Sequence, residues 1–598
     1  MLSKSPPPIV MFLVALVAGA IAALGFEPVA LWPLTLVGVT VLVAMVNTAA
    51  TPRRAALLGW AFGIGHFTAG LGWIATAFTY QAKMPAILGW VTVVLLAMFL
   101  ALYAGLAAWL ARRFASGAVA RVLALAAAWM LAEWLRGWVL SGFAWNPLGA
   151  AWLSAPGIAQ IAATGGALAL SGIMVLAAGG LWLIVRPGNV MGMRLVGGGM
   201  VAAVVITGLV GAGSEKSFYY PDATSLFIVQ PNIGQDVKYD PAREDSHVET
   251  YLELTRTALA AAANNPDDAF GRSAEVDAAI AALEFDKLAP DASATSAPGV
   301  TPPLANAPSA DAPPVPASAP PATPPAVATP AAPDAAAAPA EDAAAVARPG
   351  ALVVWSESAV PYLVEEDAAV RARLAGAIGP NDLLLFGGVA ANRAPDGKLL
   401  SLTNSLFVLD AKGKIRGRYD KAHLVPLGEY VPARPLMTAL GVARLAPGDL
   451  DFKPGPGPRS LDLPGFARVG VQICYEIIFP GAVVDANKRP GWIVNISNDA
   501  WFGASGPPQH LAQARLRAIE EGLPIVRATP TGISAVLDAN GRIVASEAPG
   551  KVGVISVSLP PPLPETFFAR FGHQTTLVFG LLLAAAALVI DRRRRIFA

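Results

Sequence analysis

Three residues in the C-terminal half of the chain have side chains suited to acyl chemistry: Glu357, Lys421 and Cys474. Each follows a short run of residues that reads as a β-strand, and functional groups tend to lie where strands end and loops begin. A thiol is mostly protonated at its reference pKa, so a nearby carboxylate base and a nearby cation would both activate it. An ammonium would also stabilise the oxyanion that forms when a carbonyl is attacked. The order Glu, Lys, Cys therefore predicts nucleophilic chemistry at a carbonyl carbon.

Each of these residues also has an ordinary structural interpretation. Cys474 is the only cysteine among 598 residues, which excludes an intramolecular disulfide and leaves a small buried core residue as the alternative to a nucleophile. Taken alone, Glu357 is a solvated loop glutamate and Lys421 a surface lysine. If Glu357 lies at the mouth of a buried strand, desolvation should raise its pKa and suit it to act as a base near neutral pH.

The elements that would position these residues predict a layered α/β domain. Helices are expected over 243–262, 365–377 and 510–521, between short β-branched runs that predict strands. These runs are SLFIVQPNI, ALVVWSESAVP, DLLLFGGVA, TNSLFVLD, VGVQICYE, GWIVNISND, ISAVLDANG and VGVISVSL. Residues 288–348 are rich in Ala, Pro, Ser and Thr and almost lack large apolar side chains, so we expect a disordered insertion that interrupts the domain.

The N-terminal part of the chain predicts a membrane domain. Overall, 55% of residues are hydrophobic, 14% are charged and the net charge is +1, which is too apolar for one soluble domain and too neutral to indicate a nucleic-acid partner. Long apolar stretches predict seven membrane-spanning helices within residues 1–213, a catalytic domain over 214–573, and a last span with a basic tail over 574–598. The expected spans are 9–26, 29–48, 56–78, 86–110, 120–139, 157–185, 194–212 and 575–590.

Basic residues predict the orientation of these spans. They concentrate in alternate connections, as at Arg53 and Arg54, at Arg112 and Arg113, and in the C-terminal run 592–595. Because Lys and Arg are enriched in cytoplasmic loops, both termini are expected in the cytoplasm. Seven spans then place residues 214–573 on the opposite, outer face of the membrane.

A longer series of motifs carries a family resemblance. The series comprises EWLRGW, FAWNPLG, VQPNIGQ, WSES, YDKAHLVPLGEYVP, CYEIIFP, SNDAWFG and QHLAQARLRAIE, and it covers most of the chain. It resembles the nitrilase superfamily, whose members use a Glu, Lys, Cys triad on an αββα sandwich, and within it the bacterial apolipoprotein N-acyltransferase family. The resemblance implies a multi-span α-helical membrane domain plus a nitrilase-like sandwich domain, set in the bacterial inner membrane with the catalytic domain in the periplasm.

The resemblance also implies roles for the three residues. Cys474 would be the nucleophile, Glu357 the general base and Lys421 the group that stabilises the tetrahedral intermediate. The implied reaction is ping-pong: a phospholipid donates an acyl chain to form a thioester, which then acylates the N-terminal amine of a diacylglyceryl-cysteine on an apolipoprotein. The resemblance implies that this reaction is the last step of lipoprotein maturation. Holding the site at the membrane avoids extracting acyl chains, at about 0.8 kcal/mol per CH₂.

Other residues enter through the same motifs. Glu429 would support the site, and Tyr475 and Glu476 would shape the acyl or acceptor pocket. Two positions depart from the family pattern: Tyr239 stands where a tryptophan is usual, and Pro530 where an asparagine is usual. These two departures leave the fine substrate preference open, but not the reaction.

The sequence leaves two other functional classes open. One is a membrane-tethered amidohydrolase of the nitrilase type, which would release free acid to water. The other is a transporter that uses the helices, with the outer domain as a receptor, and it would tolerate Cys474→Ala. The five histidines lack metal-ligand spacing, so we expect no metal and no nucleotide cofactor. We also expect a monomer whose partners are lipid and lipoprotein.

Overall fold

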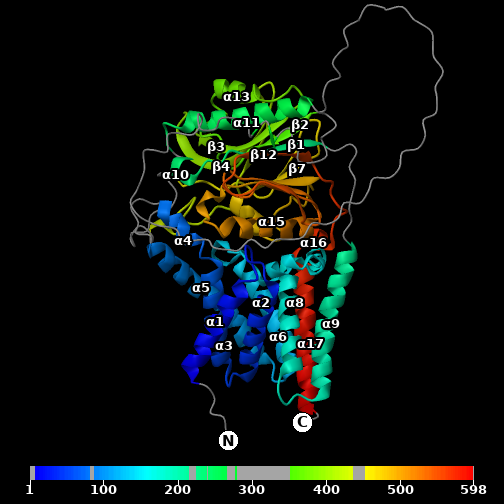
Figure 1. Ribbon diagram of the computed structural model, residues 1–598. Coiled ribbons are helices and arrows are strands. Elements are labelled where there is room, and N and C mark those ends of the chain that lie inside the picture. The colour runs from blue at the N-terminus through cyan, green and yellow to red at the C-terminus, as the bar shows by residue number, and fades with distance from the viewer. Residues whose placement is uncertain are drawn as a thin grey trace, which may run out of the picture. The chain divides into compact units, whose positions relative to one another are not determined.

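The computed structural model describes residues 7–80, 87–214, 224–238, 240–264, 277–278, 280, 350–435 and 451–596. The predicted insertion at 288–348 and the departure at Tyr239 lie outside these residues. The described residues form a helical part and an α/β part, which Figure 1 shows from the side.

Helices form at each place where a membrane span was predicted. They are α1 (Pro8–Ala23), α2 (Trp32–Thr48), α3 (Pro52–Gly70), α4 (Ile74–Ala77), α5 (Ile87–Phe114), α6 (Ala118–Arg136), α7 (Pro156–Ala159), α8 (Ala162–Val185), α9 (Met191–Ser214) and α17 (His573–Ile596). The predicted span 56–78 is not one straight helix, because the chain bends by 53° after Gly70. Within the described residues, five helices are long and apolar enough to cross a bilayer, or six with the bent pair, while α1 and α2 are shorter apolar helices.

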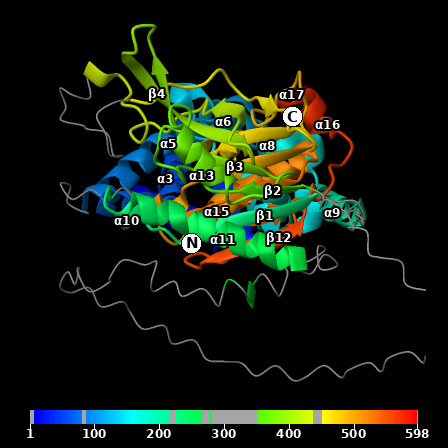
Figure 2. The ribbon, with the colours of Figure 1, turned by 90° about the horizontal axis from the view of Figure 1, so that it is seen from above.

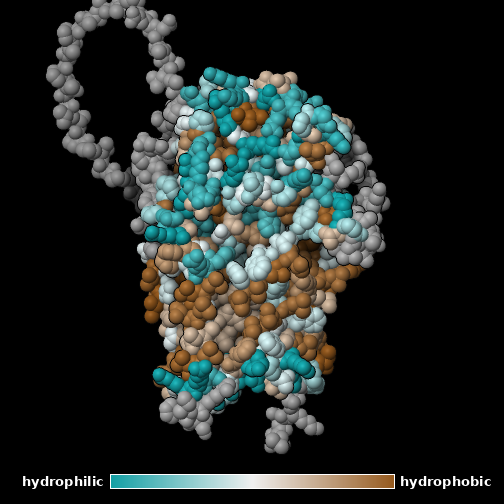
Figure 3. Space-filling view, turned by 180° about the vertical axis from the view of Figure 1, so that it is seen from behind, coloured by the Kyte–Doolittle hydropathy of each residue, from teal (hydrophilic) through white to brown (hydrophobic). Residues whose placement is uncertain are grey.

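The outer surface of these helices is apolar. Large side chains such as Leu95, Leu209 and Leu581 are 60%, 70% and 69% exposed. On the face shown in Figure 3, apolar residues form a band across the helices, with hydrophilic residues above it on the α/β part and below it at the opposite end. An apolar surface of this extent is not stable in water. The chain is therefore a membrane protein, and the apolar band is the surface that contacts the hydrocarbon of the bilayer.

The α/β part contains two six-stranded sheets. The order of the first is β12-β1-β2-β3-β4-β5 and that of the second is β11-β10-β9-β8-β7-β6. The strands are β1 (Ser225–Gln230), β2 (Ala351–Val354), β3 (Leu383–Arg393), β4 (Leu399–Asp410), β5 (Ile415–Asp420), β6 (Ser460–Leu461), β7 (Val469–Ile473), β8 (Trp492–Ile496), β9 (Ile525–Ala528), β10 (Ala535–Leu537), β11 (Ile543–Ser546) and β12 (Gly553–Ser558). All eight predicted runs form strands.

Helices cover the outer faces of the two sheets. The helices α11 (Glu244–Asn264) and α13 (Ala368–Ala375) lie over the first sheet, as Figure 2 shows from above. The helix α15 (Gly506–Glu521) lies between the second sheet and the membrane helices (Figure 1). The central strands are buried on both faces, which is why β2 reads as an unbroken apolar run, ALVV. This arrangement is the predicted αββα sandwich.

Contacts join the helical part to the α/β part. The Gln509 side chain on α15 accepts hydrogen bonds of 2.9 Å from Trp145 and Asn146, and the Glu520 carboxylate accepts one of 2.7 Å from the backbone of Ala167. On the side of the helices away from the sheets, α1 begins and α17 ends (Figure 1). The α/β part thus rests on one end of the helical part.

Candidate active site

The three residues singled out in the sequence converge at one edge of the sandwich. Glu357 follows β2, Lys421 follows β5 directly and Cys474 follows β7 directly. The strand β2 is parallel to β3, and β3, β4 and β5 alternate in direction, so β2 and β5 end at the same edge of the first sheet. Cys474 reaches the same place from the second sheet. The site therefore lies between the two sheets, in a crevice where strands end.

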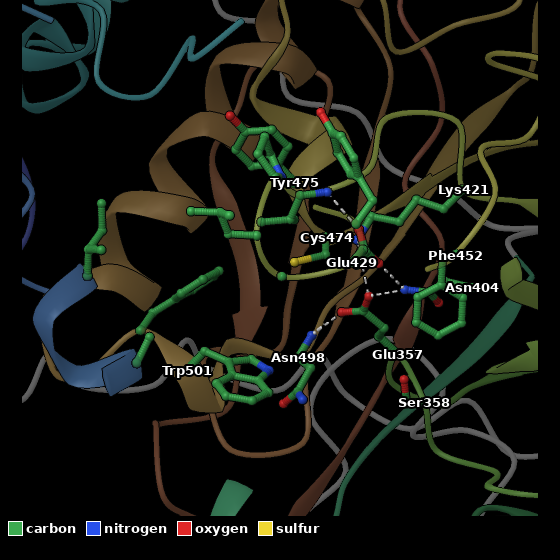
Figure 4. Close-up of a pocket in the computed structure, with 18 of the residues that line it drawn as sticks. Glu357, Ser358, Asn404, Lys421, Glu429, Phe452, Cys474, Tyr475, Asn498 and Trp501 are labelled. Atoms are coloured by element: carbon green, nitrogen blue, oxygen red, sulfur yellow. Dashed lines mark hydrogen bonds and ion pairs between the residues drawn. The ribbon is translucent and has the colours of Figure 1, made fainter. Parts of the chain in front are cut away.

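Glu357 is held as a carboxylate by three donors. Its Oε1 accepts hydrogen bonds from Asn404 Nδ2 at 2.7 Å and from Lys421 Nζ at 3.4 Å, and its Oε2 accepts one from the backbone of Asn498 at 2.7 Å (Figure 4). Burial alone would raise the pKa of Glu357, but Lys421 and these hydrogen bonds outweigh it and hold the pKa below the ordinary value. The prediction of a raised pKa for Glu357 was wrong, because it counted desolvation without these donors.

Lys421 is shared between two carboxylates. Its Nζ lies 3.0 Å from Glu429 Oε1 as well as 3.4 Å from Glu357 Oε1. Asn404 on β4 also donates to Glu429, at 2.8 Å. Burial lowers the pKa of Lys421, but Glu429 and Glu357 outweigh it and raise the pKa above the ordinary value, so the ammonium stays charged.

Sequence reasoning missed Asn404, which bridges Glu357 and Glu429. The only signal was an asparagine at the start of the strand run TNSLFVLD, before its apolar residues. Its position beside Lys421 depends on the pairing of Ser405 with Asp420 in the β4–β5 register. The sequence alone does not predict that register.

Cys474 sits on a sharp turn from strand to 3-10 helix. Its φ is +52°, in the left-handed region that side chains other than glycine rarely adopt. The carbonyl of Cys474 lies 3.1 Å from His510 Nε2, which fixes the turn from the α15 side. Burial, followed by the Glu357 carboxylate, raises the pKa of the Cys474 thiol, against the opposing effect of Lys421. The resting thiol is therefore protonated and needs a base.

The two residues after the nucleophile have different positions. Tyr475 lines a cavity in front of Cys474, and its hydroxyl donates to the carbonyl of Gly142, at 3.1 Å. Glu476 points behind the turn, where its carboxylate accepts from Tyr419 Oη at 2.8 Å and from the backbone of Ala422 at 2.7 Å. Burial raises the pKa of Glu476 to about 7. Glu476 ties the strand carrying Cys474 to the segment carrying Lys421.

The cavity in front of Cys474 has a volume of about 870 Å³ and two chemically different ends. Cys474, Glu357 and Lys421 lie at a polar end formed by the α/β part, which Figure 4 shows with Asn404, Glu429 and Asn498. The other end is formed by the membrane helices. The residues that line it include Thr92, Leu96, Phe99, Leu100, Tyr103 and Phe143.

Two further features of the cavity wall come from the motifs VQPNIGQDVK and RATPTG. Pro530, the departure from the family pattern, lines the cavity, and its carbonyl accepts from the backbone of Asn232 at 2.8 Å. Lys238 at the end of α10 (Gln235–Lys238) also lines the cavity, and its Nζ donates to the main-chain carbonyl of Glu357 at 2.9 Å. The sequence reasoning did not single out Lys238.

The two-sheet sandwich with this site defines the class of the α/β part as a carbon-nitrogen hydrolase domain of the nitrilase superfamily. Residues 328–563 match the family described as carbon-nitrogen hydrolase. Residues 18–180 match the family described as the apolipoprotein N-acyltransferase N-terminal domain.

Full-length relatives define the family more narrowly. The apolipoprotein N-acyltransferase of Rhodopseudomonas palustris is 31% identical over 97% of this chain and 95% of its own. The Bradyrhizobium diazoefficiens enzyme is 33% identical over 97% and 95%, and the Caulobacter vibrioides enzyme 34% over 95% and 92%. The chain belongs to the apolipoprotein N-acyltransferase family, acyltransferases of the carbon-nitrogen hydrolase superfamily.

Some solved structures match about a third of the chain. A mutant of the Nesterenkonia AN1 amidase of the nitrilase superfamily is 19% identical, covers 35% of this chain and 77% of its own, and has a TM-score of 0.25. Saccharomyces cerevisiae Nit3, also of that superfamily, is 20% identical over 37% and 79%, with a TM-score of 0.26.

Proposed function

We propose that the protein transfers an acyl chain from a phospholipid to the N-terminal amine of a diacylated apolipoprotein, through a thioester on Cys474, as the last step of lipoprotein maturation. One observation carries the proposal: Glu357, Lys421 and Cys474 meet at the polar end of a cavity whose other end is built by apolar membrane helices. A site with this construction joins acyl chemistry to a lipid substrate.

In the proposed first half-reaction, Glu357 takes the thiol proton while the sulfur of Cys474 bonds to the sn-1 carbonyl carbon. The ammonium of Lys421 stabilises the oxyanion. The bond from that carbon to the glycerol oxygen then breaks, and this oxygen recovers the proton from Glu357. The products are an acyl-thioester and a lysophospholipid.

In the second half-reaction, the neutral α-amine of the apolipoprotein attacks the thioester carbon. Glu357 takes the amine proton, the carbon–sulfur bond breaks, and the sulfur regains its proton. Glu429 and Asn404 hold Lys421 and Glu357 in place, and Glu476 secures the turn behind the nucleophile. Tyr475 borders the acyl chain.

Mass spectrometry of the protein after incubation with phospholipid tests the first half-reaction. We expect an acyl mass on the peptide that contains Cys474 and none in Cys474→Ala. Adding a diacylated lipopeptide should then release the acyl group as an amide. Release only as free fatty acid would instead favour the membrane-tethered amidohydrolase, and full function of Cys474→Ala would favour a transporter.

We further propose that residues 1–213 and 574–598 form the part in the bacterial inner membrane and that residues 214–573 form a periplasmic catalytic domain. Support comes from the arginines of the C-terminal run, which lie in the last turns of α17, at the end away from the sheets. In a Cys474→Ala background, a membrane-impermeant maleimide should label Lys412→Cys in spheroplasts, and label Arg593→Cys only after lysis. Both positions are exposed. The reverse pattern would overturn this topology.

A further inference from the structure

Without Lys238, the charged groups next to the nucleophile carry an excess of negative charge. Two carboxylates, Glu357 and Glu429, face the single ammonium of Lys421. These three groups together carry one net negative charge. The proposed donor is a phospholipid, whose phosphodiester is an anion on the same glycerol as the ester under attack. The phosphodiester and these carboxylates are like charges that would lie in the same cavity and repel each other, so the donor requires another cation.

Lys238 is a cation of this wall that retains free donors. Its Nζ donates to the main-chain carbonyl of Glu357 at 2.9 Å, and within the part of the chain that the structure describes its other two hydrogens have no partner. Among the described residues, no carboxylate lies within ion-pair distance of it. By contrast, Lys421 is held by two carboxylates. Arg136, the other cation that lines the cavity, donates to the Trp145 carbonyl at 2.7 Å from the end of a membrane helix.

The position of Lys238 suits the geometry of a glycerophospholipid. The sn-1 ester and the sn-3 phosphate are separated by one glycerol, so the phosphate must lie close to the carbon that Cys474 attacks. Lys238 contacts the main chain of Glu357, the residue next to that carbon in the proposed reaction. Its charge also interacts with the carboxylate of Glu357.

We propose that Lys238 binds the phosphodiester of the phospholipid donor and thereby selects the donor. This inference rests on the proposed function. Both substrates present a diacylglyceryl group, and the phosphate is the feature that the donor has and the diacylglyceryl-cysteine acceptor lacks. A phosphate bound at Lys238 forms a charge-assisted hydrogen bond with an ammonium that has no ion-pair partner among the described residues.

Burial supports this role. Desolvation lowers the pKa of Lys238 to about 8, despite the opposing effect of Glu357 and Cys474. At neutral pH most of the molecules are still charged, and the ammonium has already lost part of its hydration. An incoming phosphate therefore meets a preorganised cation, whose interaction is stronger than the same contact in bulk water.

The test compares two donors with the same chains, dipalmitoyl phosphatidylglycerol and dipalmitoylglycerol, on the full-length protein in mixed micelles. The readout is the rate at which Cys474 becomes acylated, measured by intact mass. In Lys238→Gln, kcat/KM for phosphatidylglycerol should fall at least tenfold more than that for dipalmitoylglycerol, mainly through KM. Lys238→Arg keeps the positive charge and should retain most of the preference for phosphatidylglycerol over dipalmitoylglycerol.

Other outcomes overturn the inference. An equal loss on both donors, or a loss confined to kcat, would mean that Lys238 only positions Glu357. Unchanged kinetics in Lys238→Gln would mean that the phosphate binds elsewhere, and a phosphate-selective loss in Arg136→Gln would identify the alternative. If the wild-type protein formed no thioester from phosphatidylglycerol, the proposed function itself would fail and this inference with it. The melting temperatures of the variants separate these results from misfolding.

Discussion

The two ends of the cavity are built in opposite ways. At the polar end, Glu357, Asn404, Lys421 and Glu429 are joined by hydrogen bonds of 2.7 to 3.4 Å, and the nucleophile is fixed on a strained turn. At the apolar end, side chains of α5 such as Leu96 meet the cavity through packing alone. A small displacement at the polar end changes which atoms can exchange a proton. At the apolar end, the same displacement changes only the length of acyl chain that the cavity can hold.

This difference separates reaction from substrate length. Hydrogen-bonded, buried charges tolerate little movement, because an unpaired partner costs several kcal/mol, roughly 3 to 5 when one side of a buried ion pair is removed. Apolar contacts lose free energy gradually, at about 0.8 kcal/mol per CH₂. Substitutions at the polar end should therefore abolish turnover, whereas those at the apolar end should shift preference among acyl chains.

The largest effect is expected from Glu357→Gln. An amide cannot accept the thiol proton, and its NH₂ would meet donors from Asn404 or Lys421. The rate of thioester formation should fall by about 10²- to 10⁴-fold, measured by intact mass. The residual rate should rise with pH as the Cys474 thiolate forms without a base. Glu365→Gln, a change on the exterior of the domain, serves as the control. Near-normal activity in Glu357→Gln would show that Glu357 is not the general base.

Gly387→Ala should disturb the polar end without altering any charged group. A Cβ at Gly387 would lie 2.6 Å from Glu357 Cα and 2.7 Å from the Ser356 carbonyl oxygen, so the backbone of the WSES turn must shift. We expect a loss of about 1–3 kcal/mol in stability and a large fall in the rate of thioester formation. Gly198→Ala, which meets nothing within 4 Å, is the matched control in thermal melts. A stable, fully active Gly387→Ala would show that the turn can move freely.

The two sheets and the polar end of the cavity also show how much the sequence could predict. The sandwich was predictable, because buried strands such as β2 and β7 read as apolar runs, and Glu357 and Cys474 come soon after these runs. Lys421 was singled out through the motif YDKAHLVPLGEYVP instead, because β5 (IRGRYD) is not an apolar run. The pKa of Glu357 and the role of Asn404 were not, since both depend on which side chains meet across the β4–β5 register. The bend after Gly70 was hidden because hydropathy does not change across it.

A smaller effect is expected at the apolar end from Leu96→Trp. The larger side chain would occupy space where about two methylenes of the acyl chain lie, which corresponds to roughly 1.6 kcal/mol, or about fifteenfold in kcat/KM. The loss should apply to hexadecanoyl donors and shrink for dodecanoyl donors, as measured in competition assays. Leu95→Trp is the control, because Leu95 is on the same helix but 60% exposed on its outer side. Equal losses for both chain lengths would contradict the division between the two ends.

The smallest effect is expected in the pH dependence of KM for the phospholipid donor, through the charge of Lys238. Lys238 has a lowered pKa of about 8 and is charged below it, so raising the pH removes the cation. The groups around it are Glu357 and Cys474, with Glu244 and His247 in the same cavity wall. At pH 9 about a tenth of the molecules would keep the charge, and KM for phosphatidylglycerol should rise up to about tenfold relative to pH 7. Lys238→Arg should keep KM flat over this range, because a guanidinium stays protonated. A wild-type KM that does not change between pH 7 and 9 would show that the charge of Lys238 does not contribute to donor binding.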